Sequence, residues 1–157
     1  MSTALTIPGD ISATGGNTFQ SFEQDYLALR QAEHRIYTDD ELQQLPDVAA
    51  SHPHHREWII RKRSADKLIT WLTAKARPLK ILEVGCGNGW LSKRLSEIPG
   101  SNVTGSDINY SELQQAAAVF ANVPDLYFVY GDIRGNLFKE ASFDAVVFAA
   151  SIQYFPT

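Results

Sequence analysis

Apolar runs and helical repeats alternate along the second half of the chain. Runs of mostly apolar residues are separated by two segments, 90–98 and 111–123, in which apolar side chains recur every three or four positions. Apolar strands joined by helices are typical of a parallel sheet covered on both faces. The pattern therefore predicts a doubly wound, mainly parallel α/β sheet with helices on both faces. The expected strands are 80–84, 102–108, 126–133 and 143–150.

The first half of the chain predicts helices. Capping boxes at 21–24 and 38–41 begin two of them, one over about 22–36 and a short one that stops at Pro46. A third, longer helix is expected over about 53–77, where apolar residues recur at helical spacing. Its expected inward residues are Trp58, Ile59, Ala65, Leu68, Ile69, Leu72 and Ala76.

These patterns divide the chain into three parts. Residues 1–20 are rich in Ser, Thr and Gly and have no periodicity, so we expect a flexible lead-in. Residues 21–77 form a helical region that is placed to act as a lid, and residues 78–157 form the α/β domain.

Composition narrows the classes of partner and compartment. The chain has 157 residues, 44% of them apolar, which is enough for the core of one domain. Its net charge of −4 argues against general attraction to nucleic acid or an anionic membrane surface. Neither a secretory signal nor a run of about 20 apolar residues is present, so we expect a cytoplasmic protein without a membrane span.

Two clusters in the helical region have a functional and a structural interpretation. The histidines of 52–55 could bind a metal, but no Cys or carboxylate stands at ligand spacing, so we predict a solvated loop and no metal site. The second cluster is basic and lies on the long helix. We interpret it as the solvated face of that helix, the usual state of such a cluster. It comprises Arg56, Arg61, Lys62, Arg63 and Lys67.

Candidate chemistry concentrates in residues 80–91, KILEVGCGNGWL. The strand ends in three alternating glycines, Gly85, Gly87 and Gly89, and a helix follows. Such a turn lets a polar ligand approach bare backbone N–H groups closely. Cys86 lies inside this turn. It is the single cysteine of the chain, so no internal disulfide can form, and this favours a reducing compartment. We interpret Cys86 as a small residue suited to the turn rather than as a reactive thiol.

Acidic residues end the next two strands. Asp107 follows Gly89 by 18 residues, about the spacing at which a carboxylate accepts hydrogen bonds from ribose hydroxyls. Asp132 ends the third strand, where it could meet an adenine edge while Ile133 lies on the ring. Ligands of open α/β sheets bind at these carboxyl ends, so the residues predict a nucleotide-like ligand.

The glycine spacing differs from that of dinucleotide-binding proteins. Their G-x-G-x-x-G pattern would require a third glycine at position 90, which is Trp90 here. Glu83, just before the turn, would repel a pyrophosphate but suits a ligand with an ammonium and a sulfonium group.

The ordered set EVGCGNG, SDIN, GDI and FDAVVFAASIQYF resembles the class I S-adenosylmethionine-dependent methyltransferases over about residues 79–155. The resemblance implies a Rossmann-like fold with S-adenosylmethionine as cofactor and a small-molecule methyl acceptor. It also implies roles for individual residues. The methionine and ribose parts of the cofactor would be approached by Gly85, Cys86, Gly87 and Gly89, while Glu83 would bind the ammonium and Asp107 the ribose hydroxyls. The adenine would lie between Ile108 and Ile133, and its amino group would donate to Asp132. The methyl-transfer side would be lined by Ala149 to Ser151.

The chain departs from the family at its end. Gln153 and Tyr154 stand where relatives often carry histidine, so no catalytic base is predicted. The family sheet has seven strands, whereas this chain ends at Thr157 after the fourth, so we expect part of a longer enzyme. The open strand predicts a homodimer through the sheet edge, or coverage by the N-terminal helices. An NAD- or FAD-linked oxidoreductase and a non-catalytic nucleotide-binding module remain alternatives.

Overall fold

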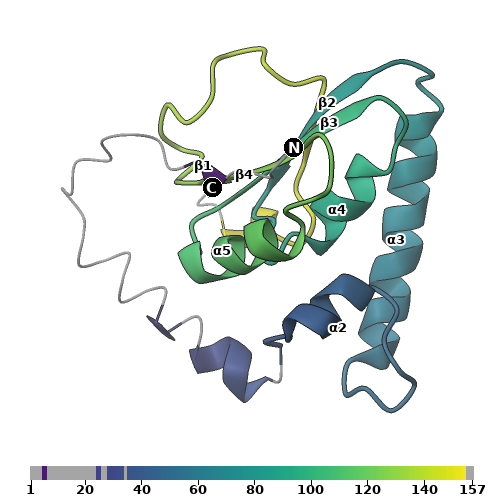
Figure 1. The fold of residues 1–157 in the computed structure, drawn as a ribbon, viewed down its shortest axis with the longest axis vertical. Helices are drawn as coiled ribbons and strands as arrows, with labels where there is room; N and C mark the ends of the chain where they lie inside the picture. The colour runs from purple at the N-terminus through teal and green to yellow at the C-terminus, as the bar shows by residue number, and fades with distance from the viewer. Residues whose placement is uncertain (1–4, 7–23, 26–27, 34, 155–157) are drawn as a thin grey trace.

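The computed structural model describes residues 5–6, 24–25, 28–33 and 35–154 (Figure 1). Residues 24–25 and 28–32 are helical, as expected for that segment, whereas the capping box at 21–24 begins outside the described residues. The elements in chain order are β1 (Leu5–Thr6), α2 (Asp39–Gln44), α3 (His55–Thr73), β2 (Leu79–Val84), α4 (Trp90–Ser96), β3 (Ser101–Asp107), α5 (Tyr110–Val119), β4 (Leu126–Tyr130), β5 (Ala145–Val147) and a 3₁₀ turn (Ile152–Tyr154).

The strands form one parallel sheet in the order β1-β4-β3-β2-β5. Ile81 of β2 pairs with Val103 of β3 on one side and with Ala145 of β5 on the other. The predicted parallel α/β sheet, with its four strands, is therefore confirmed. β1 is an addition that the Ser/Thr/Gly pattern did not predict, and the rest of the expected lead-in lies outside the described residues.

Helices α4 and α5 pack against the same face of this sheet. The steps β2-α4-β3 and β3-α5-β4 run in one direction across it, and right-handed crossovers then place both helices on one side. A Cβ on Gly105 would lie 2.7 Å from Ser92 of α4, and one on Gly89 would lie 3.1 Å from Ala116 of α5. Both positions also face Phe128.

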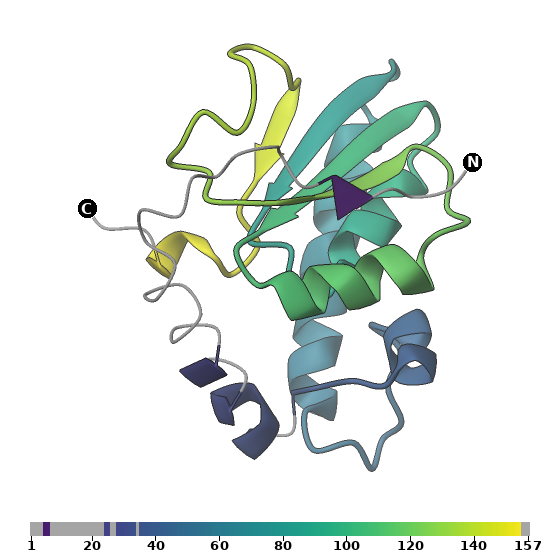
Figure 2. The same cartoon turned by 60° about the vertical axis from the view of Figure 1, so that its left-hand side comes forward.

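The opposite face carries no helix among the described residues, which corrects the expectation of helices on both faces. The connection from β4 to β5 steps back past β2, so a right-handed crossover must run over this second face. That connection, 131–144, consists of turns and bends, and it projects as a loop beside β5 (Figure 2). Its two glycines and lack of apolar helical spacing explain why no helix forms there.

The long helix α3 packs on the outside of α4. The rings of Trp58 and Trp90 meet edge to face at 5.1 Å, and Asp66 pairs with Arg94 at 2.9 Å. For two residues of this helix, the prediction that they face inward is wrong. Ile59 is 37% exposed, and Ala76 lies beyond the end of α3 at a positive φ of 50°.

The short helix α2 begins as the sequence predicts. Thr38 accepts a hydrogen bond from the Glu41 amide at 3.3 Å, the Glu41 carboxylate accepts from the Thr38 amide at 2.8 Å, and the helix ends at Gln44, before Pro46. In the loop that follows, His54 contacts the carbonyl of Glu33 at 2.7 Å. Across the described ranges no three potential metal ligands gather, and no helix there is long and apolar enough to cross a membrane.

Candidate functional site

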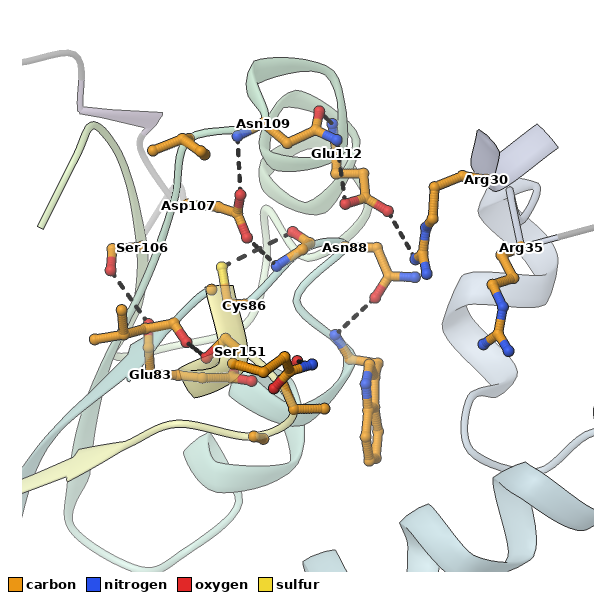
Figure 3. A pocket seen from close by; sticks show the side chains of 18 of the residues that line it. Arg30, Arg35, Glu83, Cys86, Asn88, Ser106, Asp107, Asn109, Glu112 and Ser151 are labelled. Carbon is orange, nitrogen blue, oxygen red and sulfur yellow. Dashed lines mark hydrogen bonds and ion pairs between the residues drawn. The ribbon is translucent and has the colours of Figure 1, made fainter. Parts of the chain in front are cut away.

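A cleft of about 750 Å³ opens at the carboxyl ends of β2, β3, β4 and β5. Figure 3 shows Glu83, Cys86 and Asp107 on one side of it and Arg30 and Arg35 on the other. Nine of the ten residues predicted for the cofactor site line this cleft. They are Glu83, Gly85, Cys86, Gly87, Asp107, Ile108, Asp132, Ile133 and Ala149.

The glycine turn is held by the adjacent strand β3. The amide of Gly85 donates to the carbonyl of Ser106 at 2.8 Å, and the amide of Gly87 donates to the Asp107 carboxylate at 2.7 Å. All three glycines have φ values between 53° and 76°, a region that favours glycine. The turn therefore takes a shape that other residues would strain.

Gly85 and Gly89 also meet neighbours that leave no room for a side chain. A Cβ on Gly85 would lie 2.4 Å from the Cβ of Ser151, which follows β5, and the Ser151 hydroxyl donates to the carbonyl of Val84 at 2.6 Å. A Cβ on Gly89 would lie 2.7 Å from Phe128. Gly89 is the one predicted residue that does not line the cleft, because it faces the core beneath the turn.

Glu83 is a buried carboxylate without a cation. It is 2% exposed, and the Ser92 hydroxyl donates to it at 2.5 Å. Burial, and secondarily the charge of Asp107, raises the pKa of Glu83 to about 8. Within the described part of the chain Glu83 has no ion-pair partner, so the position suits a positively charged group of a ligand.

Asp107 is fixed by backbone amides. Its two carboxylate oxygens accept from the amides of Gly87 at 2.7 Å and Asn109 at 2.8 Å. Burial raises the pKa of Asp107, and these hydrogen bonds oppose that rise. A carboxylate has about four acceptor positions, so Asp107 keeps capacity for ligand hydroxyls.

Asp132 is engaged by a residue that sequence reasoning missed. Arg134 donates to both carboxylate oxygens of Asp132, with Nε at 2.9 and 3.0 Å, and its backbone amide donates at 2.9 Å. The Arg134 hydrogen bonds lower the pKa of Asp132. The pair is exposed, with 26% of the Asp132 side chain and 58% of the Arg134 side chain accessible, so it is weak enough to rearrange.

Burial suppresses the reactivity of Cys86. Its side chain is 5% exposed, and burial raises the pKa of the thiol well above its usual value. A thiol that resists ionisation is a poor nucleophile. These properties agree with the interpretation of Cys86 as a small residue of the turn.

The opposite wall of the cleft is built from ion pairs. Arg30 pairs with Glu112 of α5 at 3.0 Å, across 82 positions in the sequence. Glu57 of α3 accepts two hydrogen bonds from Arg35, each at 2.8 Å, and pairs with Arg61 at 2.7 Å. Hydrogen bonding from Arg35 is the main cause that lowers the pKa of Glu57 to about 2. Arg61 lines the cleft, so the prediction that it belongs to the solvated face of α3 is wrong.

Comparison with known proteins identifies the domain that carries this cleft. Residues 81–157 match the family described as methyltransferase domain. A malonyl-[acyl-carrier protein] O-methyltransferase of Halalkalibacterium halodurans is 28% identical over 104 residues, which are 60% of this chain and 38% of that protein. A 27-O-demethylrifamycin SV methyltransferase of Amycolatopsis mediterranei is 31% identical over 113 residues, 66% of this chain and 42% of that protein. The chain spans less than half the length of these curated relatives.

The fold is that of solved methyltransferases. The magnesium protoporphyrin IX methyltransferase of Synechocystis PCC 6803, solved with bound SAH (S-adenosylhomocysteine), superposes with a TM-score of 0.59 at 22% identity, covering 83% of this chain and 57% of that one. The parallel sheet is thus that of a Rossmann-like methyltransferase fold. Residues 81–157 therefore form a class I S-adenosylmethionine-dependent methyltransferase domain.

Proposed function

We propose that this protein, with S-adenosylmethionine as cofactor, transfers a methyl group to a small-molecule acceptor. The observation that carries the proposal is the buried, cation-free carboxylate of Glu83 beside the glycine turn. A dinucleotide would bring a pyrophosphate next to Glu83, and its negative charge would oppose ionisation of this buried carboxyl still further. A sulfonium amino acid would bring an ammonium instead, which pairs with the ionised carboxylate and offsets the burial that raises the pKa of Glu83.

The cleft residues would divide the cofactor among them. Glu83 binds the ammonium and Asp107 the ribose hydroxyls, while Ile108 and Ile133, both lining the cleft, hold the adenine faces. Asp132 accepts from the adenine amino group once Arg134 gives way. The bound cofactor supplies an activated methyl group on sulfur, and the chain has only to align it with the acceptor.

A small acceptor group fits both the relatives and the cleft. The relatives' names specify a malonyl group on an acyl-carrier protein and a rifamycin. The wall opposite the glycine turn carries Arg30, Arg35 and Arg61 beside the Trp58 ring, a surface able to contact a polar organic acceptor. Glu57 of this wall is not proposed as a catalytic base, since hydrogen bonding from Arg35 lowers its pKa to about 2.

Calorimetric titration with S-adenosylhomocysteine and with NADH tests the cofactor. We expect S-adenosylhomocysteine to bind and Asp107→Ala to weaken it by about 1–3 kcal/mol, the scale of charged hydrogen bonds lost. Glu140→Ala, an exposed loop carboxylate, is the matched control and should bind as the wild type does. Binding of NADH alone would instead favour the oxidoreductase alternative, and unchanged affinity in Asp107→Ala would remove the ribose assignment.

The edge of β5 supports a second, structural part of the proposal. In the described part of the chain no strand pairs with its outer side, and Val146 on it is 52% exposed. Unpaired edges favour strand addition, so we propose association of two copies through β5. Sedimentation analysis should then give a dimer that Val146→Lys dissociates, and a wild-type monomer would contradict the association.

A further inference from the structure

One face of α3 carries cations and large apolar side chains directly opposite its buried face. Trp58, Ala65 and Leu72 are the buried residues of this helix. The residues half a turn away are all exposed, including Ile60 at 63% and Trp71 at 57%. Their spacing of three or four positions places them in one line. We call Arg56, Ile60, Arg63, Lys67 and Trp71, with Lys75 just beyond the helix, the α3 stripe.

The charges of the α3 stripe are not compensated. None of its four cations forms an ion pair with another described residue. Other charged residues of the same helix are engaged, as Lys62 is with Asp47 and Asp66 with Arg94. Lys75 lies 4.0 Å above the Trp71 ring. A chain with a net charge of −4 thus presents a purely cationic line along one helix.

We propose that the α3 stripe docks a small acidic protein, whose carboxylates meet the cations and whose apolar side chains meet Ile60 and Trp71. Arg and Trp are the residues that most often dominate the energy of protein interfaces. From Arg56 to Trp71 the stripe is about 22 Å long, roughly the length of a four-turn helix. Figure 1 shows α3 on the outer side of the molecule, where a partner can reach it.

An acidic protein fits the stripe better than an anionic membrane does. A membrane is a plane and would bring the acidic remainder of this protein near its own negative charge. Charges separated by more than about 8 Å are largely screened at physiological salt, so a narrow partner meets the stripe alone. The stripe is also one helix wide, which matches an acidic helix.

The stripe begins beside the cleft. Glu57 and Arg61 line the cleft, and each directly follows a stripe residue, Arg56 or Ile60. A partner docked at this end lies within one helical turn of the cleft mouth. This location suits a partner protein that delivers the methyl acceptor. The delivery role rests on the proposed function, whereas the docking itself does not.

Fluorescence anisotropy of the full chain with a labelled probe tests the docking. The probe is a helical peptide of about 16 residues with Glu along one face and Leu beside it, so that it spans the stripe. We expect saturable binding that weakens about tenfold or more between roughly 50 and 500 mM NaCl. The double variant Arg63→Glu/Lys67→Glu should weaken it at least about tenfold, and Trp71→Ala several-fold with an unchanged salt dependence.

The controls separate docking from folding and from the cofactor site. Lys139→Glu, an exposed loop cation, should bind the peptide as the wild type does, and both stripe variants should bind S-adenosylhomocysteine normally. Equal peptide binding by Arg63→Glu/Lys67→Glu would overturn the proposal. Binding to vesicles with about 30% phosphatidylserine, but not to the peptide, would overturn it in favour of a membrane surface.

Discussion

The two walls of the cleft are held by different kinds of force. The strand-end wall is positioned mainly by the backbone. The glycine turn takes positive φ values, the amides of Gly85 and Cys86 donate to the Ser106 carbonyl of β3, and the Gly87 amide donates to the Asp107 carboxylate. The helical wall is positioned by side chains, through Arg30 on Glu112 and through Arg35 and Arg61 on Glu57. Each wall therefore responds to a different perturbation.

This difference assigns different tasks to the walls. Backbone hydrogen bonds inside a sheet do not depend on salt and leave little freedom, so the strand-end wall can present a fixed set of contacts to the cofactor. Partly exposed ion pairs contribute little individually and weaken with salt. The helical wall is therefore the one that added salt is expected to loosen. The larger effects of substitution are therefore expected in the strand-end wall.

The largest effect is expected from Glu83. Its folded pKa of about 8 lies above the usual value of 4.5, so the folded state holds a proton that the unfolded state has lost. Stability is then full below about pH 4.5 and falls as the pH rises toward 8, by up to about 5 kcal/mol. Glu83→Gln carries no titrating proton and should remove most of this fall. Urea unfolding of the ligand-free protein between pH 5 and about 8 measures both.

Burial also raises the pKa of Asp107 and Glu112, so these groups add to the fall in stability with pH. The contribution of Glu83 is therefore the difference in unfolding free energy between Glu83→Gln and the wild type, followed across the pH range. Glu97→Gln, an exposed carboxylate on the same side of the sheet, should leave the wild-type curve unchanged. Parallel curves for Glu83→Gln and the wild type would mean that Glu83 is ionised in the folded protein.

The next effect is expected from Gly85→Ala. The new Cβ would lie 2.4 Å from that of Ser151 at a φ of 73°, so both the turn and the segment after β5 must shift. We expect a loss of about 2–4 kcal/mol in the free energy of unfolding. Gly135→Ala, whose Cβ would come no closer than 3.4 Å to any neighbour, should stay within about 0.5 kcal/mol of the wild type. Equal stabilities of the two variants would show that the contact with Ser151 relaxes freely.

The strand-end wall is also the part that could be predicted from the sequence. Its features are local: three glycines within five residues, a carboxylate before them and another at the end of the next strand. Parallel topology then brings separate strand ends together without further information. Local patterns did not reveal which way each glycine faces, and Gly89 proved to contact Phe128 rather than the cleft.

The helical wall could not be predicted, because its contacts join distant positions. Nothing near Arg30 in the sequence points to Glu112, and the basic face of α3 concealed the difference between Arg61 in the cleft and Arg63 in solvent. The prediction that Ile59 faces inward is wrong for a related reason. Ile59 lies at the border of the apolar face of α3, where the packing of neighbouring helices decides whether a side chain is buried.

A moderate effect on the helical wall is expected from Arg30→Ala. The change leaves Glu112, whose side chain is 12% exposed, without its cation and releases the helical segment 28–32 from α5. Hydrogen exchange of the 28–33 amides should become about five- to tenfold faster, equivalent to about 1 kcal/mol. Added salt should bring the wild type closer to the variant. Exposed Gln31→Ala is the control, and unchanged exchange in Arg30→Ala would show that other contacts hold the segment.

The smallest effect, a change in cofactor affinity, is expected from Arg134→Ala. This variant tests a residue of the strand-end wall that a side-chain ion pair holds. Asp132 belongs to the strand-end wall, yet a side-chain pair occupies its carboxylate in the ligand-free protein. If Asp132 accepts from the adenine amino group, as proposed, that group competes with Arg134 for the carboxylate, so removal of Arg134 should tighten S-adenosylhomocysteine binding about two- to fivefold in calorimetry. Asp132→Ala should weaken the same binding, since the acceptor itself is lost. Weaker binding by Arg134→Ala would instead show that Arg134 contacts the cofactor directly, with Asp132 acting only to orient it.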